Sequence, residues 1–384
     1  MQDIYITRIH IGKVRHLENV DIILSDTECK HLILTGKNGS GKTSVLEAVR
    51  DKILFHQINN YMVIREEDRK YVSLSRQKES QLELRSEQLS VDYSSPPDYA
   101  SNTFVYVSAA RNKVDVPDAI TQILNDGKTI ITRNASINFL KYILNLYVQY
   151  LSTKDSGGST EDIERYEIWF GNFTNALREI YSCQYLEIKP DMKNLTFQIV
   201  LPGREPFKLN EMSDGYAAFI DIYMELLMRL ESADAIVEYD KPAIVLIDEI
   251  ETHLHVELQK RILPFLTKAF PNIQFIVATH SPFVITSLEN AVVYDLEKKE
   301  TLDKPSLYSF ESVVESFLDT SAYSLELRRY FNRYKELCFK VRTADENEEF
   351  LIAKTELELM SPASKELYFA FNDLEDKRKM AKNG

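Results

Sequence analysis

Residues 31–43 read HLILTGKNGSGKT, in which a short apolar run passes directly into a glycine-rich loop. The run His31–Thr35 predicts a buried strand, and the apolar residues that follow the loop recur at helical spacing, at Val45, Leu46, Val49 and Ile53. Between strand and helix, Gly36–Thr43 match the pattern G-x-x-x-x-G-K-[ST] of a P-loop. The order of strand, loop and helix predicts an α/β fold with a phosphate-binding turn at its start.

The residue types of this loop suit a nucleotide triphosphate. Glycines let successive backbone N–H groups curl around phosphates, and the helix N-terminus adds the positive end of its dipole. Lys42 is expected to reach the β and γ oxygens, and Thr43 to offer its hydroxyl to Mg²⁺. The candidate nucleotide-binding residues are Gly36, Asn38, Gly39, Ser40, Gly41, Lys42 and Thr43.

A second motif lies in residues 243–255, AIVLIDEIETHLH, where an apolar strand ends in two carboxylates. Ligands of open α/β sheets bind at the carboxyl ends of the strands, which is where Asp248 and Glu249 would lie. Asp248 is predicted to hold Mg²⁺, directly or through water, and Glu249 to polarise an attacking water. The alternative is an acidic pair that only caps the following helix.

Two further motifs complete a pattern along the chain. Thr279 and His280 follow the apolar run IQFIVA, and a histidine there can hydrogen-bond a γ-phosphate and sense its loss. Ser213 and Gly215, in MSDG, open a helix whose N-terminus is another anion-binding end. A second cradle is useful if two copies sandwich the nucleotide, with Ser213 and Gly215 of one protomer capping the γ-phosphate held by Lys42 of the other.

In this order, GKNGSGKT, MSDG, LIDEIETHLH and THSP resemble the motifs of ABC-type ATPases of the RecF, SMC and OLD kind. This is the prokaryotic AAA family, whose members often serve in antiphage defence, and the resemblance covers about residues 1–300. It implies ATP and Mg²⁺ as cofactors and a head-to-head homodimer, or a higher homo-oligomer, formed on ATP. It also implies Glu249 as catalytic base, His280 as switch histidine and Glu251–His255 as the D-loop region at the dimer seam.

The chain departs from the family pattern at four positions. Transporters carry Gly where this chain has Asp214, and Glu or Gln is usual where it has Tyr216. Relatives often carry Pro at the positions of Ile250 and Val256. These departures bear on hydrolysis more than on ATP binding, so we expect a slow ATPase.

Composition limits the other possibilities. The 384 residues include 46 Lys and Arg against 59 Asp and Glu, a net charge of −13 that disfavours a broad DNA-coating surface. The three isolated cysteines, Cys29, Cys183 and Cys338, predict no disulfide framework. The sequence shows no signal peptide and no apolar run of membrane-spanning length, so we expect a cytoplasmic protein without membrane contact.

Hydrophobic periodicity outlines the rest of the chain. Residues 4–24 predict an N-terminal antiparallel hairpin with a turn at Gly12-Lys13, and residues 186–201 a second one around Asp191–Asn194. Ala243–Ile247 and Ile273–Ala278 predict buried parallel strands of a mixed central sheet. We expect an ATPase domain over residues 1–300, with a helical insertion at about 112–185, and a helical C-terminal region over residues 301–384.

Several neighbouring classes fit less well. No LSGGQ follows a compact helical subdomain, no long heptad segment lies between Thr43 and Ser213, and no strand-borne acidic cluster follows His280, which disfavours transporter, SMC and OLD architectures respectively. What remains resembles the ATPase subunits of Septu, retron-associated and PARIS-type systems, whose effector nuclease or toxin is a separate protein. The alternatives are a RecF-like repair or recombination ATPase that clamps DNA directly, and a module that keeps ATP as a structural ligand.

Three secondary features leave their interpretation open. Arg111 is a candidate phosphate contact in the Q-loop position or a surface residue, and His253 with His255 predicts packing of the D-loop rather than a zinc site. The C-terminal region is a candidate partner-binding surface. Its basic residues predict either a contact with a partner or nucleic acid, or a solvated helical face; they are Arg328, Arg329, Arg333, Lys335, Lys340 and Arg342.

Overall fold

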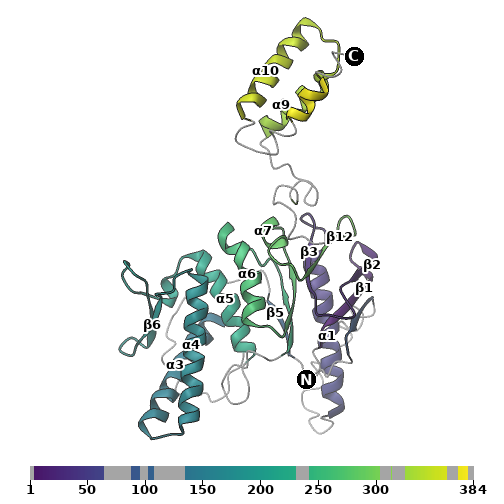
Figure 1. The fold of residues 1–384 in the computed structure, drawn as a ribbon. Coiled ribbons are helices and arrows are strands. Elements are labelled where there is room, and N and C mark those ends of the chain that lie inside the picture. Colours follow the sequence, from purple (N-terminus) through teal and green to yellow (C-terminus); the bar gives the residue numbers. More distant parts are fainter. Residues whose placement is uncertain are drawn as a thin grey trace. The chain divides into compact units, whose positions relative to one another are not determined.

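The computed structural model describes residues 4–64, 88–95, 103–107, 135–230, 242–302, 313, 325–360 and 371–378. The chain forms two compact units, residues 1–310 and 311–384 (Figure 1). The first unit extends beyond residue 300 because β12 (Glu300–Leu302) still pairs with β11 (Ala291–Asp295) in the central sheet.

The central sheet has six strands in the order β12-β11-β3-β10-β9-β5. Its middle consists of β3 (His31–Thr35), β10 (Ile273–Ala278) and β9 (Ala243–Ile247), flanked by β5 (Thr103–Val107). All pairings are parallel except that of β12, so the predicted mixed sheet is confirmed. Every residue of β3, β9 and β10 is buried, as uninterrupted apolar strands covered on both faces should be.

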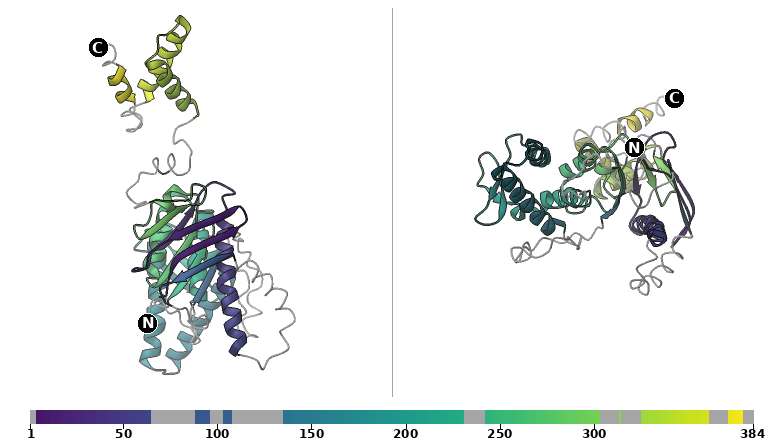
Figure 2. Two further views of the ribbon diagram at one scale, coloured as in Figure 1. Left: turned by 90° about the vertical axis from the view of Figure 1, so that its right-hand side faces the viewer. Right: turned by 90° about the horizontal axis from the view of Figure 1, so that it is seen from below.

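A second, antiparallel sheet has the order β2-β1-β4, with β1 at Ile6–Val14, β2 at Leu17–Ile23 and β4 at Leu89–Tyr93. Helix α1 (Lys42–Ile64) lies between this sheet and the central one, and its buried residues share one apolar core with both. Figure 2 shows α1 on one face of the central sheet, while the green helices that follow lie on the other.

The turn of the N-terminal hairpin lies at Arg15-His16, so the prediction of a Gly12-Lys13 turn was wrong. Val14 pairs directly with Leu17, and Arg15 takes a positive φ of 54°. Gly12 instead lies within β1, where its N–H donates to Gln88 O at 2.8 Å and a Cβ would come within 3.2 Å of that oxygen. The missing side chain of Gly12 therefore permits the close approach of a neighbouring backbone, and the chain does not reverse there.

The other face of the central sheet carries α5 (Asp214–Arg229), α6 (Val256–Ala269) and the short α7 (Pro282–Ile285). Rings from α5 and α6 meet edge to face, as in the pair Phe219–Phe265, whose centroids are 5.3 Å apart. Among the helices within the described ranges, none is both long enough and apolar enough to cross a membrane.

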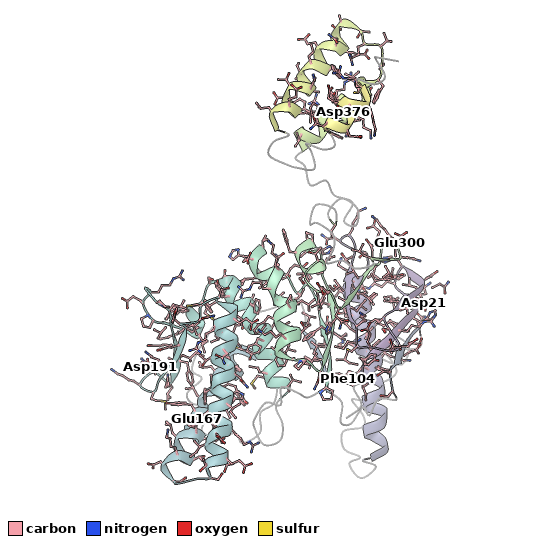
Figure 3. All side chains as sticks on the ribbon, viewed as in Figure 1. Asp21, Phe104, Glu167, Asp191, Glu300 and Asp376 are labelled. Carbon is pink, nitrogen blue, oxygen red and sulfur yellow. The ribbon has the colours of Figure 1, made fainter. Side chains whose placement is uncertain are left out.

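The predicted insertion contains a helical pair, α3 (Ala135–Asp155) and α4 (Thr160–Ile180), and a three-stranded sheet follows it. Ser159 caps α4 by accepting from the Asp162 N–H. The predicted second hairpin is confirmed by β6 (Glu187–Asp191) and β7 (Thr196–Val200), followed by β8 (Phe207–Lys208) and the 3-10 turn η1 (Leu209–Glu211). Asp191, labelled in Figure 3, accepts from the Asn194 N–H and closes the turn. Residues 112–134 of the predicted insertion lie outside the described residues.

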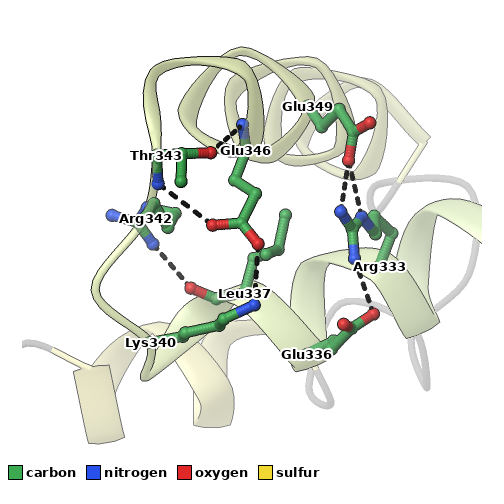
Figure 4. A network of polar contacts seen from close by, with 8 residues as sticks. All are labelled: Arg333, Glu336, Leu337, Lys340, Arg342, Thr343, Glu346 and Glu349. Atoms are coloured by element: carbon green, nitrogen blue, oxygen red, sulfur yellow. Dashed lines mark hydrogen bonds and ion pairs between the residues drawn. The ribbon is translucent and has the colours of Figure 1, made fainter.

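The second unit is built on α9 (Leu325–Cys338) and α10 (Ala344–Met360), which pack around Tyr334 and Phe350. Three of its basic residues are engaged within the unit (Figure 4). Arg333 pairs with Glu336 and Glu349, Lys340 pairs with Glu346, and Arg342 donates to Leu337 O. Three of the six basic residues of this candidate surface therefore have polar partners within the unit itself.

Candidate functional site

Three of the four motifs lie at one edge of the central sheet. Strand β10 pairs in parallel with β3 on one side and β9 on the other, so the carboxyl ends of all three strands point the same way. The loop after β3, the acidic turn after β9 and the Thr279-His280 turn after β10 therefore converge, as expected for ligand sites of open α/β sheets.

Glycines shape the loop between β3 and α1 into a close-fitting cradle. Gly36, Gly39 and Gly41 have positive φ angles of 129°, 85° and 102°, which L side chains rarely adopt. A Cβ at Gly36 would lie 2.8 Å from Ser40 Oγ, and one at Gly41 would lie 2.9 Å from the Leu17 side chain of the hairpin. Ser40 Oγ is itself buried and has no hydrogen-bond partner among the described residues.

Lys42 lies at the centre of this cradle and is 6% exposed. Its Nζ donates to Gly36 O at 2.9 Å and to Lys37 O at 3.1 Å, so the ammonium is held by the loop's own carbonyls. Burial lowers the pKa of Lys42, while the nearby carboxylates, Glu251 foremost and then Asp248, oppose that shift. A cation desolvated in this way is suited to binding phosphate oxygens.

Thr43 and Asp248 bring together a hydroxyl and a carboxylate. Thr43 Oγ1 donates to Asp248 Oδ1 at 3.2 Å, although the two residues are 205 positions apart. Asp248 is 4% exposed, and its burial raises the pKa of the carboxyl against the opposing hydrogen bond from Thr43. A carboxylate and a hydroxyl beside a phosphate cradle are the oxygen ligands that Mg²⁺ prefers, so the residues present fit MgATP.

Glu249 begins the turn that follows β9. Its backbone is left-handed, with a φ of 47°, and its Oε2 accepts from Thr252 Oγ1 at 3.2 Å. Helix α6 begins only at Val256, with His255 as its N-cap. The acidic pair therefore does not cap this helix, and strain at a non-glycine residue of a strand end is typical of functional positions.

His280 follows β10, and the turn that carries it is hydrogen-bonded to Glu251. Glu251 Oε1 accepts from the His280 backbone N–H at 2.6 Å, and Glu251 Oε2 accepts from Thr279 Oγ1 at 2.8 Å. Burial and, after it, the charge of Lys42 lower the pKa of His280, which places the ring within the field of the cradle lysine.

The signature turn is packed against the D-loop segment, Glu251–His255. Ser213 is the N-cap of α5, is exposed, and makes no capping hydrogen bond through its side chain. Gly215 is buried, and a Cβ there would come within 2.9 Å of His255 Cδ2 and 3.5 Å of His253 O. The structure thus gives Gly215 a packing reason to be glycine, and it gives both histidines a place beside the signature turn.

An open pocket adjoins the cradle. It is lined by the end of the hairpin and the first turns of α1; the residues are Lys13, Val14, Arg15, Ser44, Glu47, Ala48 and Gln88. Ser44 follows Thr43 directly, so the pocket begins where the phosphate-binding loop ends. Sequence patterns gave no signal for it, because its lining residues come from three separate segments of the chain. The candidate Arg111 lies outside the described residues.

Comparison with known proteins places these features among relatives. Residues 140–286 match the family described as "AAA domain, putative AbiEii toxin, Type IV TA system". The chain is 26% identical over 355 residues to the "Septu protein PtuA" of Bacillus mycoides (strain KBAB4), covering 86% of this chain and 47% of that protein. It is 28% identical over 173 residues to the "Retron Ec83 probable ATPase" of Escherichia coli, covering 41% of this chain and 32% of that protein.

The chain thus spans less than half the length of these relatives in each match. Among solved structures, the SMC head domain from Thermotoga maritima is similar over 76% of this chain and 94% of that one, with 13% identity and a TM-score of 0.37. The matched family and the two relatives confirm the resemblance that the motifs predicted, to ABC-type ATPases of the prokaryotic AAA family such as those of Septu and retron-associated systems.

Proposed function

We propose that this protein binds ATP with Mg²⁺ at the edge formed by β3, β9 and β10 and hydrolyses it slowly. The observation that carries the proposal is the hydrogen bond between Thr43 Oγ1 and Asp248 Oδ1, which joins the phosphate cradle to the acidic turn. Gly36, Asn38, Gly39, Ser40, Gly41 and Lys42 would hold the phosphates, Thr43 and Asp248 would hold Mg²⁺, and the pocket beside α1 would take the nucleoside.

The role proposed for each residue follows from its position in the site. Mg²⁺, when bound, would neutralise charge on the phosphate oxygens. Glu249 lies one residue beyond the metal-binding carboxylate, where it would orient and polarise the attacking water. Lys42 would stabilise charge on the β and γ oxygens, and His280 would hydrogen-bond the γ-phosphate.

The second half of the site would come from another copy of the chain. Ser213 supports this role because it is exposed at the N-terminus of α5 and its hydroxyl makes no capping bond to its own helix. With Gly215 beside it, it would cap the γ-phosphate bound by Lys42 of the partner. The product of ATP binding would be a head-to-head homodimer.

Similarity to Septu and retron proteins is the basis for a proposed biological role. The protein would act in the cytoplasm as the ATPase of an antiphage defence system, with its ATP-bound dimer controlling a separate effector nuclease or toxin. Co-purification tests this part. A bare homodimer that binds DNA tightly at physiological salt would instead favour the RecF-like clamp.

Steady-state hydrolysis tests the enzymatic part. We expect Glu249→Gln to lower kcat by about 10²-fold or more while ATP binding is kept and the dimer is strengthened. Glu257→Gln, which removes an acidic residue from the first turn of α6, is the matched control and should leave turnover unchanged. Unchanged turnover in Glu249→Gln would overturn the assignment of the base.

Mixing two inactive variants tests the shared site. Lys42→Ala and Ser213→Arg chains, each inactive alone, should recover part of the activity when combined, because a mixed dimer contains one intact composite site. Absence of any recovery, with both variants folded, would count against the head-to-head arrangement.

A further inference from the structure

The carboxylate of Glu251 bridges two turns that are distant in sequence. The residue lies three positions after Asp248, in the turn that follows β9, and both of its oxygens bond the turn that follows β10. The Oε1 bond to the His280 N–H measures 2.6 Å and the Oε2 bond to Thr279 Oγ1 measures 2.8 Å. These are short, charge-assisted contacts with the turn that carries His280.

The turn after β10 offers two donors, and each of them bonds a different oxygen of Glu251. Thr279 Oγ1 already accepts from the Ser281 N–H at 3.0 Å, so its single proton is directed to Glu251. The His280 N–H needs an acceptor of its own, because this backbone group lies in a part-buried site. A carboxylate satisfies both donors at once, whereas an amide offers only one acceptor oxygen.

We propose that Glu251 is the positioning residue of His280: its carboxylate holds the Thr279–His280 peptide so that the imidazole faces the nucleotide cradle. This inference rests on the proposed function, since it deepens the role assigned to His280. Glu251 has no need to touch the nucleotide for this role, because both of its oxygens are engaged by the β10 turn.

The arrangement also links His280 to the segment that carries Glu249. Ile250, between the two glutamates, donates its N–H to Ala278 O at 3.3 Å. Hydrogen bonds therefore join Ile250 and Glu251 to three consecutive residues, the last of β10 and the two that follow it. The charge of Glu251 opposes the fall of the His280 pKa that burial produces. Loss of the carboxylate would therefore change both the geometry and the electrostatics of the ring.

Kinetics of matched variants give the first test. Glu251→Ala should lower kcat by about 10²-fold with little change in KM, because the His280 side chain that it displaces acts after ATP is bound. Glu251→Gln keeps one acceptor oxygen and should lose only about tenfold. Glu257→Gln should match the wild type. If Glu251 acts through His280, Glu251→Ala will cause no further loss when it is added to His280→Ala.

Two outcomes of these kinetics would overturn the inference. Fully additive losses in the double variant would mean that Glu251 acts independently of His280. A rise in KM alone, with kcat unchanged, would assign Glu251 to ATP binding. If the wild-type protein shows no turnover, the proposed ATPase activity is contradicted. The positioning of His280 by Glu251 is then tested by a second measurement.

That measurement needs neither ATP nor turnover. Selective ¹⁵N-histidine labelling gives one backbone amide signal for each of the seven histidines, and His280→Gln identifies that of His280. A short bond to a carboxylate deshields the amide proton, so its signal should move upfield in Glu251→Ala and stay in Glu257→Gln. An unmoved His280 signal in folded Glu251→Ala protein would refute the positioning role.

Discussion

A buried histidine at the start of β3 makes the stability of the central sheet depend on pH. His31 is 8% exposed, and its Nδ1 lies 3.1 Å from the Phe275 backbone nitrogen, whose N–H it accepts. Burial lowers the pKa of His31 from 6.5 to about 4. A protonated ring has no lone pair for the Phe275 N–H, so the folded protein keeps His31 neutral.

The sign and size of the effect follow from comparing the folded and unfolded chains. Above pH 6.5 the ring is neutral in both, and the full stability is present. As the pH falls from 6.5 towards 4, the unfolded chain binds a proton that the folded chain does not, so stability is lost. The whole shift is worth about 3 kcal/mol, of which about 2 kcal/mol is lost between pH 7.5 and pH 5.

Urea unfolding followed by circular dichroism at pH 7.5 and pH 5 measures this loss. His31→Asn keeps a side-chain acceptor but removes the titrating ring, so the stability difference between wild type and variant should fall by about 2 kcal/mol at the lower pH. Thr27→Ala, which alters an exposed residue with no titrating group, is the control and should show no such change. A pH-independent difference for His31→Asn would refute the reasoning.

Three other substitutions test packing, the cradle and the second unit. Gln274→Leu should cost about 2–4 kcal/mol in urea unfolding, because it leaves the buried N–H and C=O of Ile6 without partners. Gly41→Ala should weaken ATP binding at least tenfold by calorimetry while the protein stays folded, because alanine is strained at a φ of 102°. Thr343→Ala should destabilise the second unit by about 1 kcal/mol in thermal unfolding, because Thr343 Oγ1 accepts from the Glu346 N–H at the start of α10.

The motifs predicted the central sheet well because parallel strands align their carboxyl ends. Once β3, β9 and β10 are recognised as buried strands, the residues that follow each of them must meet at one edge. The hairpin turn was mispredicted because a glycine has two uses, and Gly12 serves close backbone approach rather than reversal. Local sequence does not distinguish these two uses.

The roles of residues whose partners are distant in the sequence could not be predicted either. Glu251 has its hydrogen-bond partners 28 and 29 positions away, so no local pattern marks it. The pocket beside the cradle has the same property, because hairpin and helix form its walls together. The packing of Gly215 on His255 likewise depends on a tertiary contact.

Two of the four departures from the family pattern have structural explanations in this chain. Tyr216, in place of the usual Glu or Gln, stacks on Tyr181 with ring centroids 4.2 Å apart and planes within 7°, which joins the first turn of α5 to the end of α4. Ile250 is fully buried, and its N–H donates to Ala278 O at 3.3 Å. A proline at this position has no N–H to donate. Isoleucine therefore adds a hydrogen bond between the turn that carries Glu251 and the strand that leads to His280, so this departure strengthens the link on which the proposed position of His280 depends.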